Sequence, residues 1–304
     1  MYTKVVALLV AAVTLTACGA AAGSSDVSQQ QPRITAAKVD RIAAEVPRAI
    51  RDRGALQVIT SVGTVPPLSF YDTDNKTPIG VEVDIASLVA DVLGLKTQTN
   101  VASWENVFVG LDSGKYDAGF TNITVTEARK EKYDFATYRL DNVSFEARKG
   151  SNWKVSGAPD VAGRTIAVSS GTNQEKLLLD WNAQNVAHGL EPVDIKYFQN
   201  STDYYLALQS GRIDAYLGPN PTAAYHVKSS GQTEIVGTIS GAGPTLQGEI
   251  AATTKKGNGL VRALNDALNQ VIADGSYRKV LDRWGLGNEA VPKSVINPPG
   301  LPRT

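Results

Sequence analysis

The sequence predicts an α/β protein built of two lobes, and two observations support this fold class. Helical patterns alternate with short apolar segments along the chain, an order typical of α/β layers with largely parallel sheets. In addition, the motif L-x-S-G-basic-x-D-A occurs twice, in LDSGKYDAGF (111–120) and LQSGRIDAYL (208–217). Each copy reads as a helix end, a glycine and a buried strand. We therefore expect two lobes of similar construction, although other helix-glycine-strand joints can share this pattern.

The first half of the chain supplies the elements of this pattern in order. Apolar residues at helical spacing predict a helix over about 36–53, with Pro47 as a kink or restart. A strand is expected at 56–61, followed by a loop rich in turn residues at 65–78. The segment VEVDIASLVADVLG then predicts an amphipathic helix that Gly94 ends.

The second half repeats these elements. An amphipathic helix precedes each copy of the repeated motif, the first beginning near Trp104 and the second containing Tyr204. The segment 164–181 predicts a strand, a tight Ser-Ser-Gly-Thr turn and a helix. The segment 259–285 predicts two amphipathic helices joined at Asp274 and Gly275.

Composition excludes several classes of function. The chain has 304 residues, of which 42% are hydrophobic, enough for a core in each of two domains. Lys plus Arg equals Asp plus Glu at 30 each, so nothing favours a nucleic-acid partner. The two histidines, His188 and His226, have no metal-site spacing or obvious carboxylate partner. We expect no metal, no cofactor and no enzymatic activity.

The N-terminus resembles a bacterial lipoprotein signal. Lys4 and the apolar run VVALLVAAVTLTA precede LTAC, which ends at Cys18, the single cysteine of the chain. We expect a signal peptide over 1–17 and a lipid on the Cys18 thiol, although a free cysteine can also be an inert small hydrophobic residue. Residues 18–35, small and polar, are expected to be a flexible linker.

Two segments suggest sites for an anion. In TNITVTEARKEKYDF (121–135), Thr124 or Thr126 can cap a helix near Glu127, Thr124 also fits a capping box, and Arg129 would lie one turn inside this helix. A guanidinium there would suit a carboxylate, but Arg129 can equally be a solvated helix residue. The second segment is the turn Ser169, Ser170, Gly171 and Thr172, whose helix N-terminus can bind a carboxylate or be a plain N-cap.

From about Gly54 to Gly285 the chain resembles the extracellular solute-binding proteins of polar amino-acid ABC importers. The following motifs carry the resemblance, in the order and at the spacing of that family: GVEVDIASLVADVLGL, LDSGKYDAGFTNITVTEARKEKYDFATY, AGRTIAVSSGTNQEKLL, LQSGRIDAYLG and DALNQVIADGSYRKVLDRWG. The resemblance implies the two-lobed periplasmic-binding-protein fold of type II, with two hinge strands near 139–148 and 246–254. It implies a lobe 1 of 36–143 and 248–290, a lobe 2 of 144–247, and an irregular tail of 291–304.

The resemblance also implies the ligand-binding residues. Arg129 would clamp a ligand carboxylate with help from Thr124, and Asn122 of the same segment is expected beside them. Trp104 would supply an aromatic wall, and the turn from Ser169 to Thr172 would close on the ligand from lobe 2. Closure would bury the ligand, and a permease would bind the closed form.

The implied partners are a small amino-acid-like solute, an ABC permease with its ATPase, and the membrane through the lipid anchor. The protein would be an extracytoplasmic monomer, and it would bind no nucleic acid. Two alternatives stay open: a periplasmic dehydratase-like enzyme on the same fold, which would need a cavity carboxylate as general acid, and a ligand sensor that docks to a receptor.

The chain departs from the family pattern where an acid often binds the ligand's α-ammonium. Pro219 occupies that position, and Val62 and Val65 stand where an acid and an aromatic residue are frequent. A buried ammonium without a counter-charge costs several kcal/mol. Another acid must reach the cavity, with Glu105, Glu249 and Asp141 as candidates, or the ligand lacks a standard α-ammonium. We expect a basic amino acid to be disfavoured.

The second repeat ends in Gly218, Pro219 and Asn220, near the expected cleft. Gly218 would let the backbone approach the ligand. Asn220 is either the N-cap of the helix that follows, with Pro221 in its first position, or a ligand contact.

Overall fold

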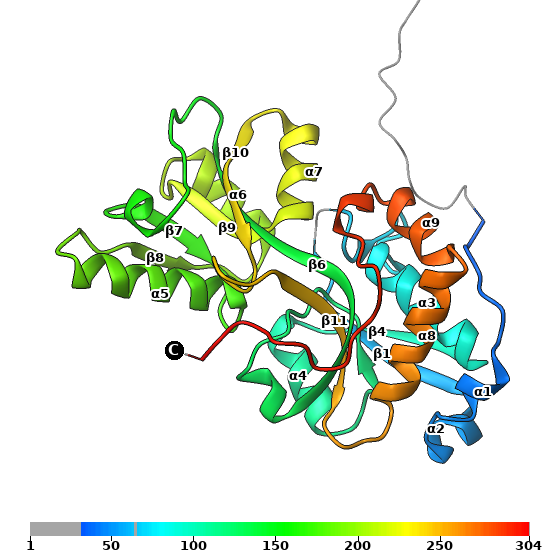
Figure 1. The fold of residues 1–304 in the computed structure, drawn as a ribbon. Helices are drawn as coiled ribbons and strands as arrows, with labels where there is room; N and C mark the ends of the chain where they lie inside the picture. The colour runs from blue at the N-terminus through cyan, green and yellow to red at the C-terminus, as the bar shows by residue number, and fades with distance from the viewer. Residues whose placement is uncertain (1–31, 64–65, 304) are drawn as a thin grey trace, which may run out of the picture.

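The computed structural model describes residues 32–63 and 66–303, which form two α/β lobes joined by a long strand (Figure 1). The signal peptide over 1–17, Cys18 and most of the expected linker lie outside the described residues. None of the helices within the described residues has the length and apolar character needed to cross a membrane.

Lobe 1 contains a mixed sheet in the order β4-β1-β5-β11-β6. Its strands are β1 (Ala55–Thr60), β4 (Lys96–Val101), β5 (Ala118–Gly119), β6 (Tyr133–Arg148) and β11 (Gly248–Lys255). Strand β1 pairs in parallel with β4 and β5, whereas β11 is antiparallel to β5 and β6. A short hairpin of β2 (Phe70–Tyr71) and β3 (Pro78–Ile79) lies apart from this sheet.

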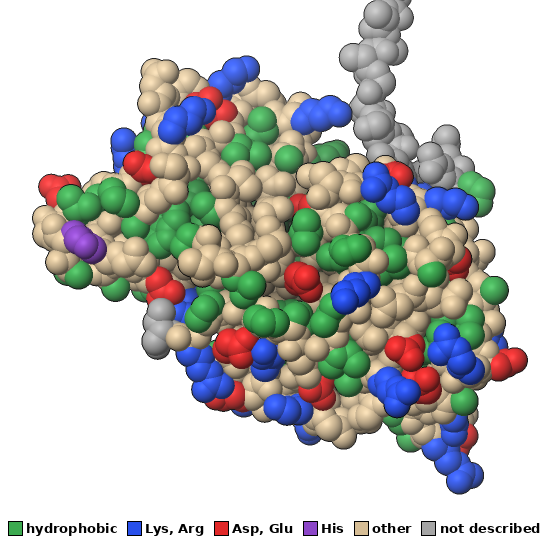
Figure 2. All heavy atoms as spheres, viewed as in Figure 1, with side chains coloured by type: hydrophobic (Ala, Val, Ile, Leu, Met, Phe, Trp, Pro, Cys, Tyr) green, Lys and Arg blue, Asp and Glu red, His purple; other side chains and the backbone are tan. Residues whose placement is uncertain are grey.

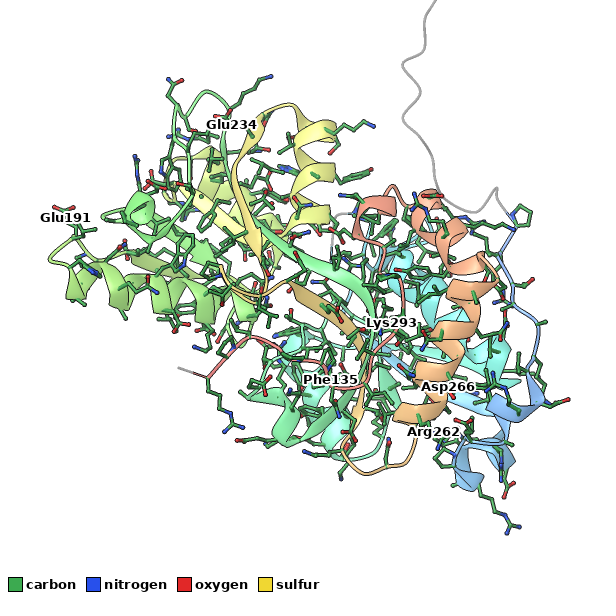
Figure 3. All side chains as sticks on the ribbon, in the orientation of Figure 1. Phe135, Glu191, Glu234, Arg262, Asp266 and Lys293 are labelled. Carbon is green, nitrogen blue, oxygen red and sulfur yellow. The ribbon has the colours of Figure 1, made fainter. Side chains whose placement is uncertain are left out.

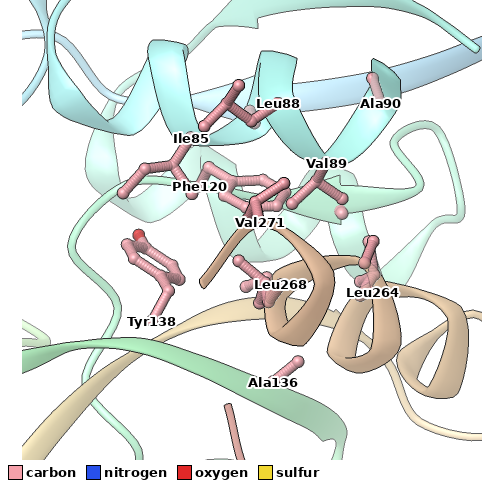
Figure 4. Packing of buried hydrophobic residues seen from close by; sticks show 14 of the residues in the cluster. Ile85, Leu88, Val89, Ala90, Phe120, Ala136, Tyr138, Leu264, Leu268 and Val271 are labelled. Atoms are coloured by element: carbon pink, nitrogen blue, oxygen red, sulfur yellow. The ribbon is translucent and has the colours of Figure 1, made fainter. Parts of the chain in front are cut away.

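Helices cover the lobe 1 sheet and form its main core. They are α1 (Asp40–Ala43), α2 (Arg48–Arg53), α3 (Val81–Leu93), α4 (Trp104–Asp112), α8 (Val261–Ala273) and α9 (Ser276–Arg283). Figure 4 shows Ile85 and Val89 of α3 close to Leu268 and Val271 of α8, in the same cluster as Phe120. The expected helix over 36–53 is two short helices, because the chain restarts at Pro47, whose fixed φ starts α2.

Lobe 2 repeats the sheet pattern of lobe 1. Its strands are β7 (Thr165–Val168), β8 (Asp194–Tyr197), β9 (Ala215–Pro219) and β10 (Thr233–Ser240), and its helices are α5 (Asn173–Ala187), α6 (Ser201–Gln209) and α7 (Asn220–Ser230). Strand β7 pairs in parallel with β8 and β9, and β6 lies antiparallel beside β9. The order β8-β7-β9-β6 therefore matches β4-β1-β5-β11 in lobe 1.

The lobes are joined by β6 and by the segment 241–247. Residues 133–141 of β6 pair with β11 in lobe 1, while residues 142–148 pair with β10 in lobe 2. The segment 241–247 connects β10 back to β11. Residues 291–303 contain no helix, but backbone contacts hold them on lobe 1: Asn297 N donates to Phe135 O (3.0 Å), and Leu301 forms a β-bridge with Thr126.

The 3-10 helices are η1 (Arg129–Glu131), η2 (Ala158–Val161) and η3 (Gly287–Glu289). The prediction of a helix near Glu127 is therefore wrong, since one 3-10 turn at η1 leads directly into β6. Thr126 Oγ1 accepts from Arg129 N (3.0 Å), whereas the Thr124 side chain binds Asp141.

Charged side chains of both signs are interspersed over the face shown in Figure 2, as expected from their equal numbers. In Figure 3, the labelled Glu191, Glu234 and Arg262 lie at the periphery, away from the junction of the lobes. The surface gives no sign of a large patch of one charge on this face, so recognition of a small molecule depends on the groups inside the molecule.

Candidate ligand-binding cleft

A cavity of about 250 Å³ lies between the lobes and is lined by both. From lobe 1 it receives Ser61, Val62, Gly63, Leu68, Ser69, Glu82, Trp104, Thr121 and Asn122. From lobe 2 it receives Ser169, Thr172, Asn173, Gln174, Gln199, Asn200, Ser201, Tyr204, Tyr216, Leu217, Pro219 and Thr222. Most of these side chains are uncharged hydroxyl or amide groups, so the wall offers many hydrogen bonds and few charges.

Glu82, near the N-terminus of α3, is the acidic residue of this lining, and the sequence reasoning missed it. Its Oε1 accepts from Arg139 Nη2 (2.8 Å), and its Oε2 accepts from the Tyr138 hydroxyl. Arg139 also pairs with Glu289 and donates to Asn122 Oδ1. Glu82, Arg139 and Glu289 are all at most 1% exposed.

We call Glu82, Arg139 and Glu289 the buried triad. Burial alone would lower the pKa of Arg139, but Glu289 and Glu82 hold it above its usual range. Burial, with Glu82 adjacent, raises the pKa of the Tyr138 hydroxyl, which therefore remains a donor. Two carboxyl groups share one guanidinium, so the triad has one formal net negative charge, and its member Glu82 lines the cavity.

Two stacked tyrosines form part of the lobe 2 wall. The rings of Tyr204 and Tyr216 lie 3.7 Å apart with an interplanar angle of 3°. Gly218 is not among the lining residues, but it makes this packing possible, because a Cβ there would lie 2.2 Å from the Tyr216 ring. The sequence pattern revealed Tyr204 only as part of an amphipathic helix and gave no indication that Tyr216 meets it.

Arg129 lies at the edge of the cleft, where it connects the lobes. Its Nη1 donates to Thr124 O and its Nη2 to Gly171 O, both at 3.0 Å. The guanidinium lies 5.3 Å from the Trp104 ring centroid and 5.2 Å from that of Phe108. Burial lowers the pKa of Arg129 to about 10, and Asp141 opposes that shift. Arg129 is not among the residues that line the cavity.

The other expected residues of lobe 1 divide into two groups. Trp104 and Asn122 line the cavity, and Trp104 Nε1 donates across the cleft to Gly171 O (3.4 Å). Asn122 has a left-handed backbone (φ 54°), which directs its side chain to Arg139. Thr124 is fully buried, and its Oγ1 donates to Asp141 Oδ2 (2.8 Å) rather than facing the cavity.

Some polar groups of the turn over 169–172 already bind helix α5. Ser169 and Thr172 line the cavity, whereas Ser170 and Gly171 do not. Gly171 N donates to Glu175 Oε2 (2.7 Å), and Thr172 Oγ1 accepts from Glu175 N (3.2 Å) as the N-cap of α5. The N–H groups of Gly171 and Glu175 are satisfied by helix capping, and the hydroxyls of Ser169 and Thr172 already donate to Phe198 O and Ser169 O.

The end of the second repeat differs from the expectation for Asn220. Pro219 lines the cavity, but Asn220 does not. Asn220 is the first residue of α7 and makes no capping bond; its Oδ1 accepts from Ser144 Oγ (2.8 Å) on β6. Three acids were expected to supply the negative charge that Pro219 lacks. Glu105 is exposed, and neither Glu249 nor Asp141 lines the cavity.

Comparisons with known proteins identify the family. The family described as bacterial extracellular solute-binding proteins, family 3, matches residues 57–287. The chain belongs to this family.

Relatives within the family are amino-acid-binding proteins. The L-cystine-binding protein TcyJ of Escherichia coli (strain K12) is 31% identical over 236 residues, covering 77% of this chain and 84% of TcyJ. The arginine-binding protein ArgT of Corynebacterium glutamicum is 27% identical over 261 residues, covering 85% of this chain and 83% of ArgT.

Solved structures have the same two-lobed fold. One is the ancestral amino-acid-binding protein AncCDT-1, described as a precursor of cyclohexadienyl dehydratase. It has a TM-score of 0.66 and 25% sequence identity, with 78% of this chain and 97% of that chain covered. The predicted α/β fold of the type II periplasmic-binding class is therefore confirmed.

Proposed function

We propose that this protein is the extracytoplasmic substrate-binding component of an ABC importer, and that it binds an amino acid between its lobes. The observation that carries the proposal is the cavity lined by both lobes, with Glu82 on one side and neutral polar groups on the other. A binding protein that closes around its ligand needs such a cavity, and family membership points to the same role.

The buried triad supplies the counter-charge that Pro219 does not. A buried ammonium needs a nearby negative charge, and the net charge of the triad faces the cavity through Glu82. We propose that the ligand's α-ammonium lies against Glu82 and Asn122. The proposed acid thus stands at the start of a helix in lobe 1 and not at a strand end in lobe 2.

Arg129 is proposed to bind the carboxylate of the ligand. A guanidinium has five N–H donors in a planar fork, and two of those of Arg129 already donate to carbonyl groups of Thr124 and Gly171. A carboxylate at the cleft edge would add a charge-assisted bond to this cation and draw the Gly171 turn inward with it.

We propose a ligand whose side chain has no net charge, and L-cystine, whose second half is a zwitterion, is the first compound to test. The triad has one net negative charge, which the α-ammonium would use, so the cationic side chain of arginine or lysine would lack a partner. The hydroxyl and amide groups of the wall suit a polar, uncharged side chain. Because one relative binds L-cystine and another binds arginine, the affinities of these two compounds should be compared first.

The proposal includes a lipid anchor on Cys18, a permease and an ATPase as partners, and a monomeric state. The sequence around Cys18 supports the anchor. Membrane fractionation of a Cys18→Ser variant checks it: the variant should leave the membrane fraction, and continued retention would exclude this anchor.

Isothermal titration calorimetry with L-cystine, L-glutamine, L-arginine and a des-amino carboxylate tests the ligand class. We expect a neutral amino acid to bind with a Kd near 1 μM or below, equivalent to about 8 kcal/mol. Glu82→Gln should weaken its binding by about 10- to 100-fold, because it removes the net negative charge but leaves Arg139 paired with Glu289.

The des-amino compound is the matched control, since its affinity should not fall in Glu82→Gln. Full retention of amino-acid affinity in that variant would exclude Glu82 as the ammonium partner. Failure of every compound to bind would contradict an amino-acid ligand altogether. Binding is preferred over catalysis because Glu105 and Glu249, the candidates for a general acid, do not line the cavity, and Glu82, which does, is held by Arg139 and the Tyr138 hydroxyl.

A further inference from the structure

Asp141 lies on β6 at the point where the chain passes between the lobes. It is 1% exposed and is the last residue of β6 paired with β11 in lobe 1. Its Oδ2 accepts two hydrogen bonds, one from Thr124 Oγ1 of lobe 1 (2.8 Å) and one from Asn173 Nδ2 of lobe 2 (3.0 Å). A single carboxylate oxygen is therefore shared by the two lobes.

Asn173 extends this contact to the cavity and to the second crossing. It is the first residue of α5 and lines the cavity. Its Nδ2 also donates to Gly241 O (3.0 Å), at the start of the segment 241–247. Gly241 lies so close to Asp141 that a Cβ on it would fall 1.7 Å from Oδ2. Both crossings and the first turn of α5 thus meet at one carboxylate.

We propose that Asp141 is a positioning residue for ligand binding, which fixes Thr124 and Asn173 in the single arrangement that the closed lobes require. Rotation of one lobe about β6 moves Thr124 relative to Asn173, so both bonds to one oxygen cannot be kept at other angles. The carboxylate holds the side chain of Asn173, which lines the cavity. It also holds the side chain of Thr124, whose backbone carbonyl accepts a hydrogen bond from Arg129.

The charges around Asp141 make this contact sensitive to pH. Burial raises the pKa of Asp141 to about 6, against the hydrogen bonds from Thr124 and Asn173 and the nearby charge of Arg139. Glu289 of η3 acts in the same direction as burial, and Arg129 of η1 is a further charge within range. From α5 and the second crossing, the groups in contact are neutral, Asn173 and Gly241.

The sign of the pH effect follows from this shift. Above about pH 6 Asp141 is a carboxylate, and its two hydrogen bonds are charge-assisted and therefore stronger than neutral ones. Below that pH it is protonated, and both bonds weaken. Ligand affinity should therefore fall as the pH decreases from 7.5 to 5.

Calorimetry over pH 5 to 7.5 tests the proposal, with L-cystine or whichever amino acid of the panel binds. This calorimetric test rests on the proposed function. Asp141→Asn keeps the size of the side chain but removes its charge. We expect it to weaken binding about tenfold at pH 7.5 and to abolish the pH dependence between 5 and 7.5. Thr124→Val, which removes one donor without changing charge, should weaken binding by a similar factor.

Glu249→Gln is the matched control, because Glu249 lies in the neighbouring hinge strand β11, opposite Leu140, and makes no bridge between the lobes. It should keep the affinity and pH profile of the wild type. An Asp141→Asn variant with wild-type affinity, or with an unchanged pH profile, would overturn the proposal.

Small-angle X-ray scattering of the protein without ligand tests the bridging role of Asp141 independently of the proposed function. The wild type at pH 7.5 should have a smaller radius of gyration than Asp141→Asn, since the closed arrangement loses its bridge in the variant. Equal radii would contradict the role of Asp141 even if an amino acid binds. A difference in radii without binding of any amino acid would contradict the proposed ligand and support the bridge.

Discussion

The joints that precede the cleft are built alike in the two lobes. In lobe 1, Asp117 N donates to Gln57 O (2.9 Å), and Asp117 Oδ2 accepts from Gln57 N (2.7 Å). In lobe 2, Asp214 N donates to Thr165 O (2.8 Å), and Asp214 Oδ2 accepts from Thr165 N (2.9 Å). Each aspartate also pairs with an arginine, Arg53 in lobe 1 and Arg164 in lobe 2.

The cavity walls beyond these joints are different. Lobe 1 presents Glu82, supported by the buried triad, whereas lobe 2 presents stacked tyrosines with hydroxyl and amide groups. The carboxylate of each joint aspartate accepts a hydrogen bond from a backbone N–H of the neighbouring strand. Both lobes have this N–H because their strand orders match, so the fold requires an acceptor there. We propose that the side chains of the wall contact the ligand, so the two lobes can differ there.

The largest effect should come from breaking the buried triad with Arg139→Met. Removal of the guanidinium leaves Glu82 and Glu289 buried without a counter-charge, which should cost about 3–5 kcal/mol of unfolding free energy. Urea denaturation measures it. The comparison in lobe 2 is Glu146→Gln, whose partners His226 and Thr233 keep an acceptor, so the loss should be about 1–2 kcal/mol. Equal losses would show that the triad is not a special feature of lobe 1.

A smaller effect should separate the two joints. Asp117→Ala should cost about 1–3 kcal/mol, because its carboxylate is only 11% exposed and binds both Gln57 N and Arg53. Asp214→Ala should cost less, about 1 kcal/mol, since this carboxylate is 40% exposed and its nearest Arg164 nitrogen is 3.9 Å away. Thermal and urea denaturation check both, and a larger loss at Asp214 would reverse this ranking.

The smallest effect concerns the helices that lead into the joints. Asn200, the N-cap of α6, accepts from Asp203 N (2.9 Å), whereas Ser103, the N-cap of α4, makes no capping bond. Asn200→Ala should therefore lower the unfolding free energy by about 1 kcal/mol, and Ser103→Ala by only a few tenths. The difference is measured by urea denaturation at constant pH. Similar losses in both variants would mean that capping does not distinguish the lobes.

The residues expected at the site divide by whether they line the cavity, and their roles in ligand binding stay predictions. Trp104, Asn122, Ser169 and Thr172 line the cavity; Trp104 and Thr172 stand at the start of a helix, whereas Asn122 follows β5 in a segment without an α-helix. Arg129, Thr124 and Asn220 have partners that only folding brings near, and the structure places all three outside the lining. Their proposed or revised roles depend on these distant partners.

Residue patterns along the chain predict the two lobes and the repeated joints, and the motifs indicate the family. The lobes and joints follow from periodicity and from local rules, such as a glycine after a helix and an aspartate before a buried strand, whereas the family follows from the order and spacing of its motifs. Only the tertiary structure placed Glu82 with Arg139 and Glu289, and Asp141 between Thr124 and Asn173. A buried charge is stable only beside its partner, and these partners lie far apart in the chain, so no local pattern reveals them.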